Sequence, residues 1–258
     1  LFDVLFIDPP TAENLEANKK IIAEHADQIA CFIYEPLVQG AGGMLMHQAE
    51  HLSDLMVYCK SQGVLLIQDE VFVGFGRTGT LFAADQLTEK PDVMCFSKGL
   101  TGGTMPMGIT TCTEELYQAF YSDDKKKALF HGHSFTASPI GCAASLASMD
   151  LLLLDATQAK IKAIVESHYQ FAEELKGYEN AKNVRQTGTI LAFDWETKSE
   201  TSYFNRVQEK LFNEFMKRGV LLRPMGNVLY ILPPYCTEKE DLEYTYQQIL
   251  ELLNNNDI

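Results

Sequence analysis

Basic side chains are scarce in this sequence. Across 258 residues, 21 Lys and Arg stand against 35 Asp and Glu, so the formal net charge is -14. A surface of this sign repels nucleic-acid phosphates and anionic lipid headgroups, because neither finds a counter-charge. No apolar stretch is long enough to span a bilayer. We therefore expect neither a nucleic-acid partner nor a membrane partner.

Closely spaced cysteines are also missing. The six cysteines are scattered: Cys31, Cys59, Cys95, Cys112, Cys142 and Cys236. Without a Cys-x-x-Cys pair, neither a zinc site nor a redox dithiol is expected. Several of these residues lie in apolar runs, where cysteine acts as a small buried hydrophobe, and this usage favours a reducing, cytoplasmic location. His47 and His51 could share a helix face but have no third ligand, so we expect a surface pair rather than a metal site.

An initiating methionine is absent as well. The sequence begins at Leu1 and continues directly into an apolar run, LFDVLFI. We interpret this as a chain that begins within a domain.

Short apolar runs alternate with segments of helical period in the first half. The runs 29–34, 64–68, 93–97 and 108–113 have apolar residues on both faces and predict buried strands, as parallel strands are. Between the first two runs, Leu52, Leu55, Met56 and Cys59 share one helical face, and Gly63 follows where a helix would end. Strand, helix and strand at this spacing predict an α/β fold with a mostly parallel sheet.

The second half predicts a different architecture. We expect helices over 138–155, 156–176, 203–218 and 238–254, and strands over 188–196, 220–224 and 228–234. This order is typical of a small α+β domain. We therefore divide the chain into residues 1–155, part of a large domain, and residues 156–258, a small C-terminal domain.

Charged side chains follow three of the predicted strands. Glu35 follows the first strand, Asp69 and Glu70 follow the second, and Lys98 follows the third. The carboxyl ends of parallel strands meet at one edge of a sheet, where ligands bind in folds of this class. The pattern predicts a functional site, the alternative being a set of buried ion pairs.

Lys98 and Asp69 together suggest a particular chemistry. An apolar strand before Lys98 can desolvate its amine and favour the neutral, nucleophilic form, which bonds to an aldehyde cofactor as a Schiff base. A carboxylate at the neighbouring strand end, Asp69, can pair with the protonated nitrogen of a pyridine ring. The glycines of the following run, GLTGGTMP, let the backbone pass close to a flat or anionic group.

Three runs carry a resemblance to a known family. EPLVQGAGGM (35–44), QDEVFVGFGRTG (68–79) and FSKGLTGG (96–103) resemble the class III aminotransferases, which are pyridoxal-phosphate enzymes of the aspartate-aminotransferase-like fold. Phe72 and Val73 depart from the pattern, since most members have Gln followed by Thr or Ser there. The runs 98–106, 130–148 and 221–235 most resemble the branch that converts 8-amino-7-oxononanoate to 7,8-diaminononanoate in biotin synthesis. The resemblance covers only the later part of the family's length.

The resemblance implies cofactor contacts in the first half of the chain. It makes Lys98 the Schiff-base lysine, Asp69 the partner of the pyridine nitrogen, and Val71 a side chain that packs either on the ring or simply in the core. His133 and Ser134 would reach the cofactor phosphate from the neighbouring subunit. Other family members have proline in place of His133, so its contact is expected through the backbone.

The resemblance also implies substrate contacts. Gly132 matches a position where the backbone meets the substrate. Arg223, expected within a buried strand, would bind the carboxylate of 8-amino-7-oxononanoate, with a structural salt bridge as the alternative. Tyr230 would line the same pocket.

Several functional expectations follow from the family. The amino donor is expected to be S-adenosylmethionine, although some members use lysine, and the enzyme a homodimer with shared active sites. The family's earlier part supplies a glycine-serine turn that holds the phosphate, so we expect this chain alone to be inactive. The alternatives are an aminotransferase of the same class acting on acetylornithine, ornithine or an ω-amino acid, a non-catalytic partner with this fold, and a lysine-dependent aldolase.

Overall fold

The protein falls into two compact units. The computed structural model describes residues 2–197, 201–202 and 205–255. Unit 1 comprises Leu1–Leu37, His47–Phe75 and Phe82–Leu151, and unit 2 comprises Val38–Met46, Gly76–Leu81 and Leu152–Ile258. The sequence-based division at residue 155 into a cofactor-binding domain and a small C-terminal domain stays a prediction. It did not anticipate the two inner segments of unit 2.

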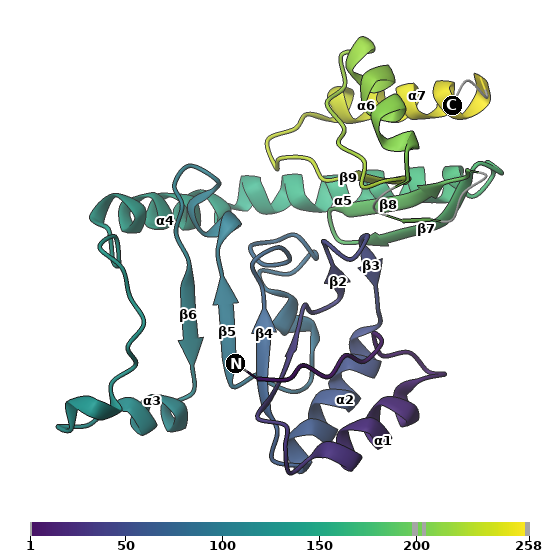
Figure 1. Ribbon diagram of the computed structural model, residues 1–258. Coiled ribbons are helices and arrows are strands. Elements are labelled where there is room, and N and C mark those ends of the chain that lie inside the picture. Colours follow the sequence, from purple (N-terminus) through teal and green to yellow (C-terminus); the bar gives the residue numbers. More distant parts are fainter. Residues whose placement is uncertain (1, 198–200, 203–204, 256–258) are drawn as a thin grey trace. The chain divides into compact units, whose positions relative to one another are not determined.

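Unit 1 is built on a four-stranded sheet. Its strands are β1 (Cys31–Tyr34), β4 (Leu65–Asp69), β5 (Val93–Phe96) and β6 (Ile109–Cys112), in the spatial order β1-β4-β5-β6 (Figure 1). β1, β4 and β5 are parallel, and β6 is antiparallel to β5. The predicted α/β class with a mostly parallel sheet is confirmed. The prediction for 108–113 was right about the strand but wrong about its setting, because β6 is antiparallel and exposed along its whole length.

Two helices cover one face of this sheet. α1 (Leu15–His25) and α2 (Ala49–Ser61) contact each other beside β4 (Figure 1). The four apolar residues predicted on one helical face are all buried, and they belong to one core cluster: Ile22, Tyr34, Leu52, Leu55, Met56, Cys59, Val64 and Leu66. Gly63 follows α2 with a φ of 75°, which confirms it as the helix stop. α1 was not predicted.

The histidine interpretation was wrong for His47. This residue precedes α2 and does not share its face with His51. Its Nε2 accepts a hydrogen bond from the backbone N–H of Leu37 at 3.0 Å, and burial lowers its pKa to about 4. His47 therefore anchors the backbone at Leu37, shortly after β1 ends, and it does not form a surface pair with His51.

Unit 1 also contains α3 (Glu114–Phe120) and most of α4 (Pro139–Leu152). The small residues of α4 allow close contact, since a Cβ on Gly141 would lie 3.0 Å from the sulfur of Met107. Among the described residues, no single helix is long and apolar enough to cross a membrane. One bent pair, Pro139–Leu152 with Asp155–Leu175, reaches that threshold by length and composition alone.

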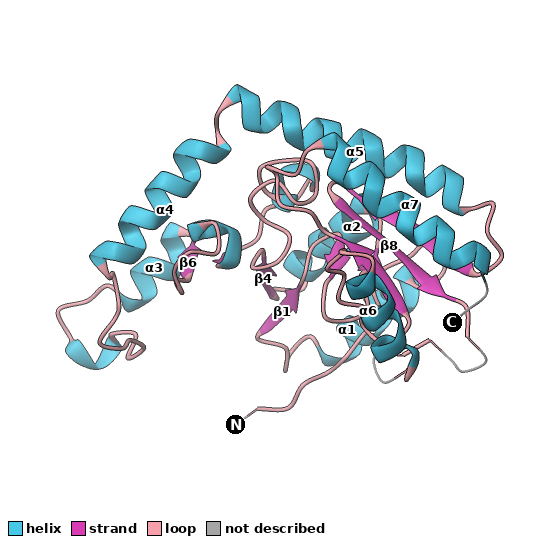
Figure 2. Cartoon of the chain, turned by 90° about the horizontal axis from the view of Figure 1, so that it is seen from above, coloured by secondary structure: helices cyan, strands magenta, loops and turns pink. Residues whose placement is uncertain are grey.

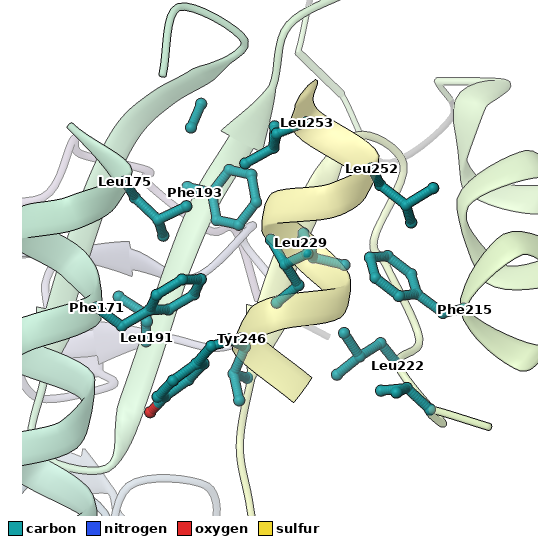
Figure 3. Close-up of a cluster of buried hydrophobic side chains, with 14 of the residues drawn as sticks. Phe171, Leu175, Leu191, Phe193, Phe215, Leu222, Leu229, Tyr246, Leu252 and Leu253 are labelled. Atoms are coloured by element: carbon teal, nitrogen blue, oxygen red, sulfur yellow. The ribbon is translucent and has the colours of Figure 1, made fainter. Parts of the chain in front are cut away.

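Unit 2 packs helices on an antiparallel sheet. The strands are β7 (Ala181–Thr187), β8 (Ile190–Trp195) and β9 (Val228–Ile231), and the helices are α5 (Asp155–Leu175), α6 (Val207–Lys217) and α7 (Lys239–Asn255). α5 and α7 lie side by side (Figures 1 and 2). Between them, Phe171 stacks on Tyr246 with ring centres 4.1 Å apart (Figure 3). Phe193 and Phe215 are fully buried in the same cluster.

A small hairpin also belongs to unit 2. β2 (Val38–Gln39) and β3 (Leu45–Met46) pair antiparallel. Arg185 on β7 holds this hairpin, because its guanidinium donates to the carbonyls of Gly43 and Met44, each at 2.8 Å. The same guanidinium pairs with Asp194 of β8 at 2.8 Å.

One predicted strand of the second half is wrong, and one strand was missed. Residues 220–224 form no strand: Val220 and Leu222 are buried, Leu221 is 75% exposed, and the chain then turns back through a Met225–Val228 bridge. Alternating burial here comes from packing without a sheet partner. The helix expected over 203–218 is present as α6, although residues 203 and 204 lie outside the described part of the chain. β7 was missed because its sequence, AKNVRQT, is polar.

Candidate functional site

The candidate site lies at the carboxyl ends of β1, β4 and β5. Tyr34 pairs with Gln68, and Asp69 pairs with Cys95, so the three parallel strands end in close register. Asp69 is the last residue of β4, and Lys98 lies two residues after the end of β5. The fold thus brings Asp69 and Lys98 to one edge of one sheet.

Asp69 is half-buried and shapes the turn that follows β4. Its Oδ1 accepts a hydrogen bond from the backbone N–H of Val71 at 2.8 Å. This side-chain turn fixes both the carboxylate and the backbone of Val71, whose own side chain is half-buried. The carboxylate is therefore held in place before any ligand binds.

Glu70, the next residue, is fully buried and lies on the opposite side of the strand. Its carboxylate accepts hydrogen bonds from the Gln68 side chain at 2.8 Å and from the backbone N–H groups of Ala83 and Ala84 at 3.0 and 2.8 Å. Burial raises the pKa of Glu70, and these hydrogen bonds lower it in part. Sequence reasoning placed Glu70 among the charged residues at the strand ends but gave it no role of its own. Its position beside a candidate catalytic carboxylate was the only signal.

Lys98 is exposed, so the desolvation expected from its apolar strand is not found. Its Nζ instead lies 5.3 Å from the centre of the Phe72 ring, within the range of a cation–π contact. Phe72 is one of the two departures from the family pattern. The backbone of Lys98 has a φ of 42°, which is uncommon for a residue with a side chain, and such strain concentrates at functional positions.

The glycine-rich turn after Lys98 is closely packed. A Cβ on Gly99 would lie 2.9 Å from Phe75, too close for any side chain. The carbonyl of Gly99 accepts a hydrogen bond from the hydroxyl of Ser148 on α4 at 3.1 Å. The glycine thus fits the turn between two neighbours and fixes the backbone that carries Lys98.

The loop with Gly132, His133 and Ser134 is exposed. The backbone N–H of His133 donates to the Thr136 hydroxyl at 3.1 Å, and its Nδ1 accepts from the N–H of Phe135 at 3.1 Å. The backbone group expected to reach a phosphate is therefore engaged within its own loop. Among the described residues, no hydrogen bond connects this loop to Asp69 or Lys98. The structure does not bring these predicted cofactor contacts together within unit 1.

Arg223 and Tyr230 belong to unit 2. Arg223 is exposed and lies outside any strand, so its expected place in a buried strand was wrong. Within the described residues its guanidinium forms no salt bridge, which leaves the alternative structural role without support. Tyr230 is half-buried on β9, where it pairs with Ala192 of β8.

Comparison with known proteins decides the family. The model of the family "Aminotransferase class-III" matches residues 8–253. The chain belongs to the class III aminotransferases. Pyridoxal phosphate is the cofactor of this family, in agreement with the chemistry inferred from Lys98 and Asp69.

Individual relatives add detail. The chain is 40% identical to the adenosylmethionine-8-amino-7-oxononanoate aminotransferase of Synechococcus elongatus, over 98% of this chain and 62% of that protein. It is 39% identical to the protein of the same name from Geobacter sulfurreducens, over 92% of this chain and 54% of that protein. This chain therefore spans somewhat more than half the length of these relatives.

Two solved structures also match this chain. The crystal structure of adenosylmethionine-8-amino-7-oxononanoate aminotransferase from Methanocaldococcus jannaschii matches with a TM-score of 0.89 and 30% identity, over 97% of this chain and 59% of that one. An (S)-enantioselective omega-transaminase from Thermomicrobium roseum matches with a TM-score of 0.86 and 28% identity, over 95% of this chain and 55% of that one.

Proposed function

We propose that this chain carries the catalytic lysine of a pyridoxal-phosphate-dependent aminotransferase that converts 8-amino-7-oxononanoate to 7,8-diaminononanoate in biotin synthesis. The observation that carries the proposal is the placement of Lys98 and Asp69 at neighbouring strand ends of one sheet. The relatives from Synechococcus elongatus and Geobacter sulfurreducens are both named adenosylmethionine-8-amino-7-oxononanoate aminotransferase, and these names support 8-amino-7-oxononanoate as the substrate.

The residues present suit the cofactor. When bound, pyridoxal phosphate supplies an aldehyde that takes up amino groups and a ring that withdraws electrons. The exposed amine of Lys98 is free to bond to an aldehyde, and the Asp69 carboxylate, already oriented by the N–H of Val71, suits a protonated ring nitrogen. Val71, which follows Asp69 directly, would contact one face of the ring.

Lys98 then acts as the proton carrier. Its Nζ would remove a proton from the carbon that bears the donor's amino group. It would later deliver a proton to the carbon that takes up the amino group, so that one amine serves as general base and general acid. The contact with Phe72 gives the side chain a resting position from which it swings. Asp69 would stabilise a positively charged ring nitrogen, since its carboxylate is already oriented by the N–H of Val71.

Substrate recognition is assigned to Arg223 and Tyr230 of unit 2 and to Gly132 of unit 1. Arg223 would bind the carboxylate of 8-amino-7-oxononanoate in a bidentate pair, with Tyr230 beside it. Gly132 would meet the substrate through its backbone, and His133 and Ser134 would reach the phosphate of a neighbouring subunit in a homodimer. S-adenosylmethionine is the proposed amino donor, and the cytoplasm the proposed location.

A second candidate is an ω-transaminase. The similarity to the Thermomicrobium roseum enzyme favours it, at a lower identity than the biotin-synthesis relatives show. The two candidates differ in which carbonyl compound accepts the amino group.

The test is a transamination assay on a fusion protein. This protein joins the present chain to the segment of the Synechococcus elongatus relative that has no counterpart in the present chain. With S-adenosylmethionine or lysine as donor, 7,8-diaminononanoate should form from 8-amino-7-oxononanoate, whereas the chain alone should form none. Arg223→Met should raise the KM for this acceptor roughly 10- to 100-fold, as expected for losing hydrogen bonds between charged groups. The exposed Arg206→Met is the matched control. Amination of ω-keto acceptors but not of 8-amino-7-oxononanoate would assign the second candidate instead.

A further inference from the structure

The turn that carries Lys98 has an unusual backbone. Lys98 itself has a φ of 42°, in the left-handed region that disfavours residues with a side chain. The turn spans Lys98–Thr101 and ends at Gly102, whose φ is 60°. The N–H of Gly103 donates to the carbonyl of Lys98 at 3.2 Å and closes the turn. A strained conformation of this kind persists only where the surrounding structure holds it.

Two hydrogen bonds shape this turn from the chain that follows it. The Ser97 hydroxyl donates to the carbonyl of Met107 at 2.6 Å. The Thr101 hydroxyl donates to the carbonyl of Met105, also at 2.6 Å. Both acceptors lie in the same stretch of chain, so these two bonds fold residues 97–107 onto themselves and do not attach them to a helix.

The Ser148 hydroxyl attaches the turn to α4. It donates to the carbonyl of Gly99 at 3.1 Å, across a sequence separation of 49 residues. A Cβ on Gly102 would lie 3.3 Å from the same hydroxyl oxygen, so the helix meets the turn at two of its glycines. Ser148 and Gly99 are both half-buried and belong to unit 1. The contact therefore links Lys98, through its neighbour Gly99, to the body of that unit.

Phe75 restrains Gly99 as well. A Cβ on Gly99 would lie 2.9 Å from two atoms of the Phe75 side chain. The Phe75 ring is itself held in edge contacts with Phe82 and Phe96, whose ring centres lie 5.6 and 5.9 Å away. Gly99 thus has no room to move towards this aromatic cluster, and the bond from Ser148 holds its carbonyl at α4.

We propose that Ser148 is a positioning residue for Lys98, on which it acts through the carbonyl of Gly99. Its hydrogen bond keeps Lys98 in the left-handed conformation that places Nζ 5.3 Å from the centre of the Phe72 ring. The strain of one left-handed residue and the free energy of one hydrogen bond are of the same order, so losing this bond releases the turn. The effect on reactivity rests on the role of Lys98 in the proposed function, whereas the hold on the backbone does not.

The test compares Ser148→Thr with Ser148→Val in the fusion protein of the transamination assay. The two new side chains have nearly the same shape, and only threonine keeps the hydroxyl. Amide hydrogen exchange of the cofactor-free protein, followed by mass spectrometry of a peptide that covers residues 97–107, reports on the turn. Borohydride trapping of pyridoxal phosphate at a series of times reports on the rate at which Lys98 bonds to the aldehyde.

Ser148→Val should raise the exchange rate of the turn about 3- to 10-fold, the factor expected for losing one neutral hydrogen bond. It should slow the trapping of Lys98 by a similar factor and lower kcat, with the KM for 8-amino-7-oxononanoate unchanged. Ser148→Thr should keep the parent values. The matched control is Ser167→Val, which alters a half-buried serine on α5 and should change none of these quantities.

Three results would overturn the proposal. They are equal exchange in the two Ser148 variants, faster exchange spread over the whole of unit 1 instead of residues 97–107, and unchanged trapping of Lys98 despite faster exchange of the turn. Where Ser148→Val does not fold, Ser148→Ala takes its place. If pyridoxal phosphate attaches to Lys98 in none of the proteins, the proposed function fails, and the difference in exchange alone decides whether Ser148 holds the turn.

Discussion

Gln68 donates a hydrogen bond from its side-chain amide to the carboxylate of Glu70 at 2.8 Å, on the covered side of the end of β4. Tyr34 completes the chain of contacts, since its hydroxyl bonds to Gln68 at 3.0 Å. Asp69 lies between Gln68 and Glu70 in sequence, and its side chain points to the opposite side of the strand. The buried contacts of its neighbours thus fix the direction of the candidate cofactor carboxylate.

Glu70→Gln should destabilise unit 1 by about 1–3 kcal/mol, because an amide cannot accept all three hydrogen bonds and leaves a buried N–H without a partner. Urea unfolding followed by circular dichroism measures this. Glu114→Gln changes an exposed side chain on α3 and should shift the free energy of unfolding by less than about 0.5 kcal/mol. Equal effects of the two changes would show that the Glu70 contacts are not stabilising.

Arg185→Met should cost unit 2 about 3–5 kcal/mol. The change leaves the carboxylate of Asp194, whose side chain is 8% exposed, without its charged partner, and burying an uncompensated charge is expensive. It also frees the carbonyls of Gly43 and Met44.

The control for Arg185 is Lys217→Met. Lys217 pairs with Glu214, but its side chain is 70% exposed, so its loss should change the free energy of unfolding by no more than about 0.5 kcal/mol. Urea unfolding of both variants compares a buried with an exposed ion pair. Similar losses would mean that the Arg185 pair adds nothing beyond a surface contact.

His168 should make the protein less stable in mild acid. Burial beside Tyr246 lowers its pKa to about 4, below the ordinary value of 6.5. The folded state therefore keeps His168 neutral while the unfolded state takes up a proton, so stability is complete above about pH 6.5 and is lost as the pH falls towards 4. The loss attributable to this residue is about 3 kcal/mol.

His168→Asn tests this by removing that part of the pH dependence. Free energies of unfolding at pH 7 and pH 4.5 should differ less in the variant than in the parent chain, with His47 supplying part of what remains. The exposed His25→Asn should keep the parent profile. An unchanged profile in His168→Asn would refute the assignment.

The regular part of the fold was predictable because periodicity reports burial. Leu52, Leu55, Met56 and Cys59 repeat at helical spacing and are all buried. The apolar runs predicted β1, β4 and β5, and Asp69 ends β4 while Lys98 follows β5 by two residues. Neighbouring parallel strands then brought these two residues to one edge without further information.

Other features depend on contacts that sequence patterns do not encode. β7 is polar and was missed because it is held by pairing with β8 and by the ion pair of Arg185 with Asp194. Leu222 lies in an apolar run yet packs without a strand partner. The exposure of Lys98 and its contact with Phe72 depend on the loop after β4, which the buried carboxylate of Glu70 holds.

The measurement that tests the central claim most directly is borohydride trapping of the cofactor. The chain joined to the unmatched segment of the Synechococcus elongatus relative is incubated with pyridoxal phosphate, reduced, digested and mapped by mass spectrometry. The phosphopyridoxyl group should be found on the peptide that contains Lys98, should disappear in Lys98→Ala and should remain in the exposed control Lys90→Ala. A label on another lysine, or an undiminished label in Lys98→Ala, would contradict the assignment.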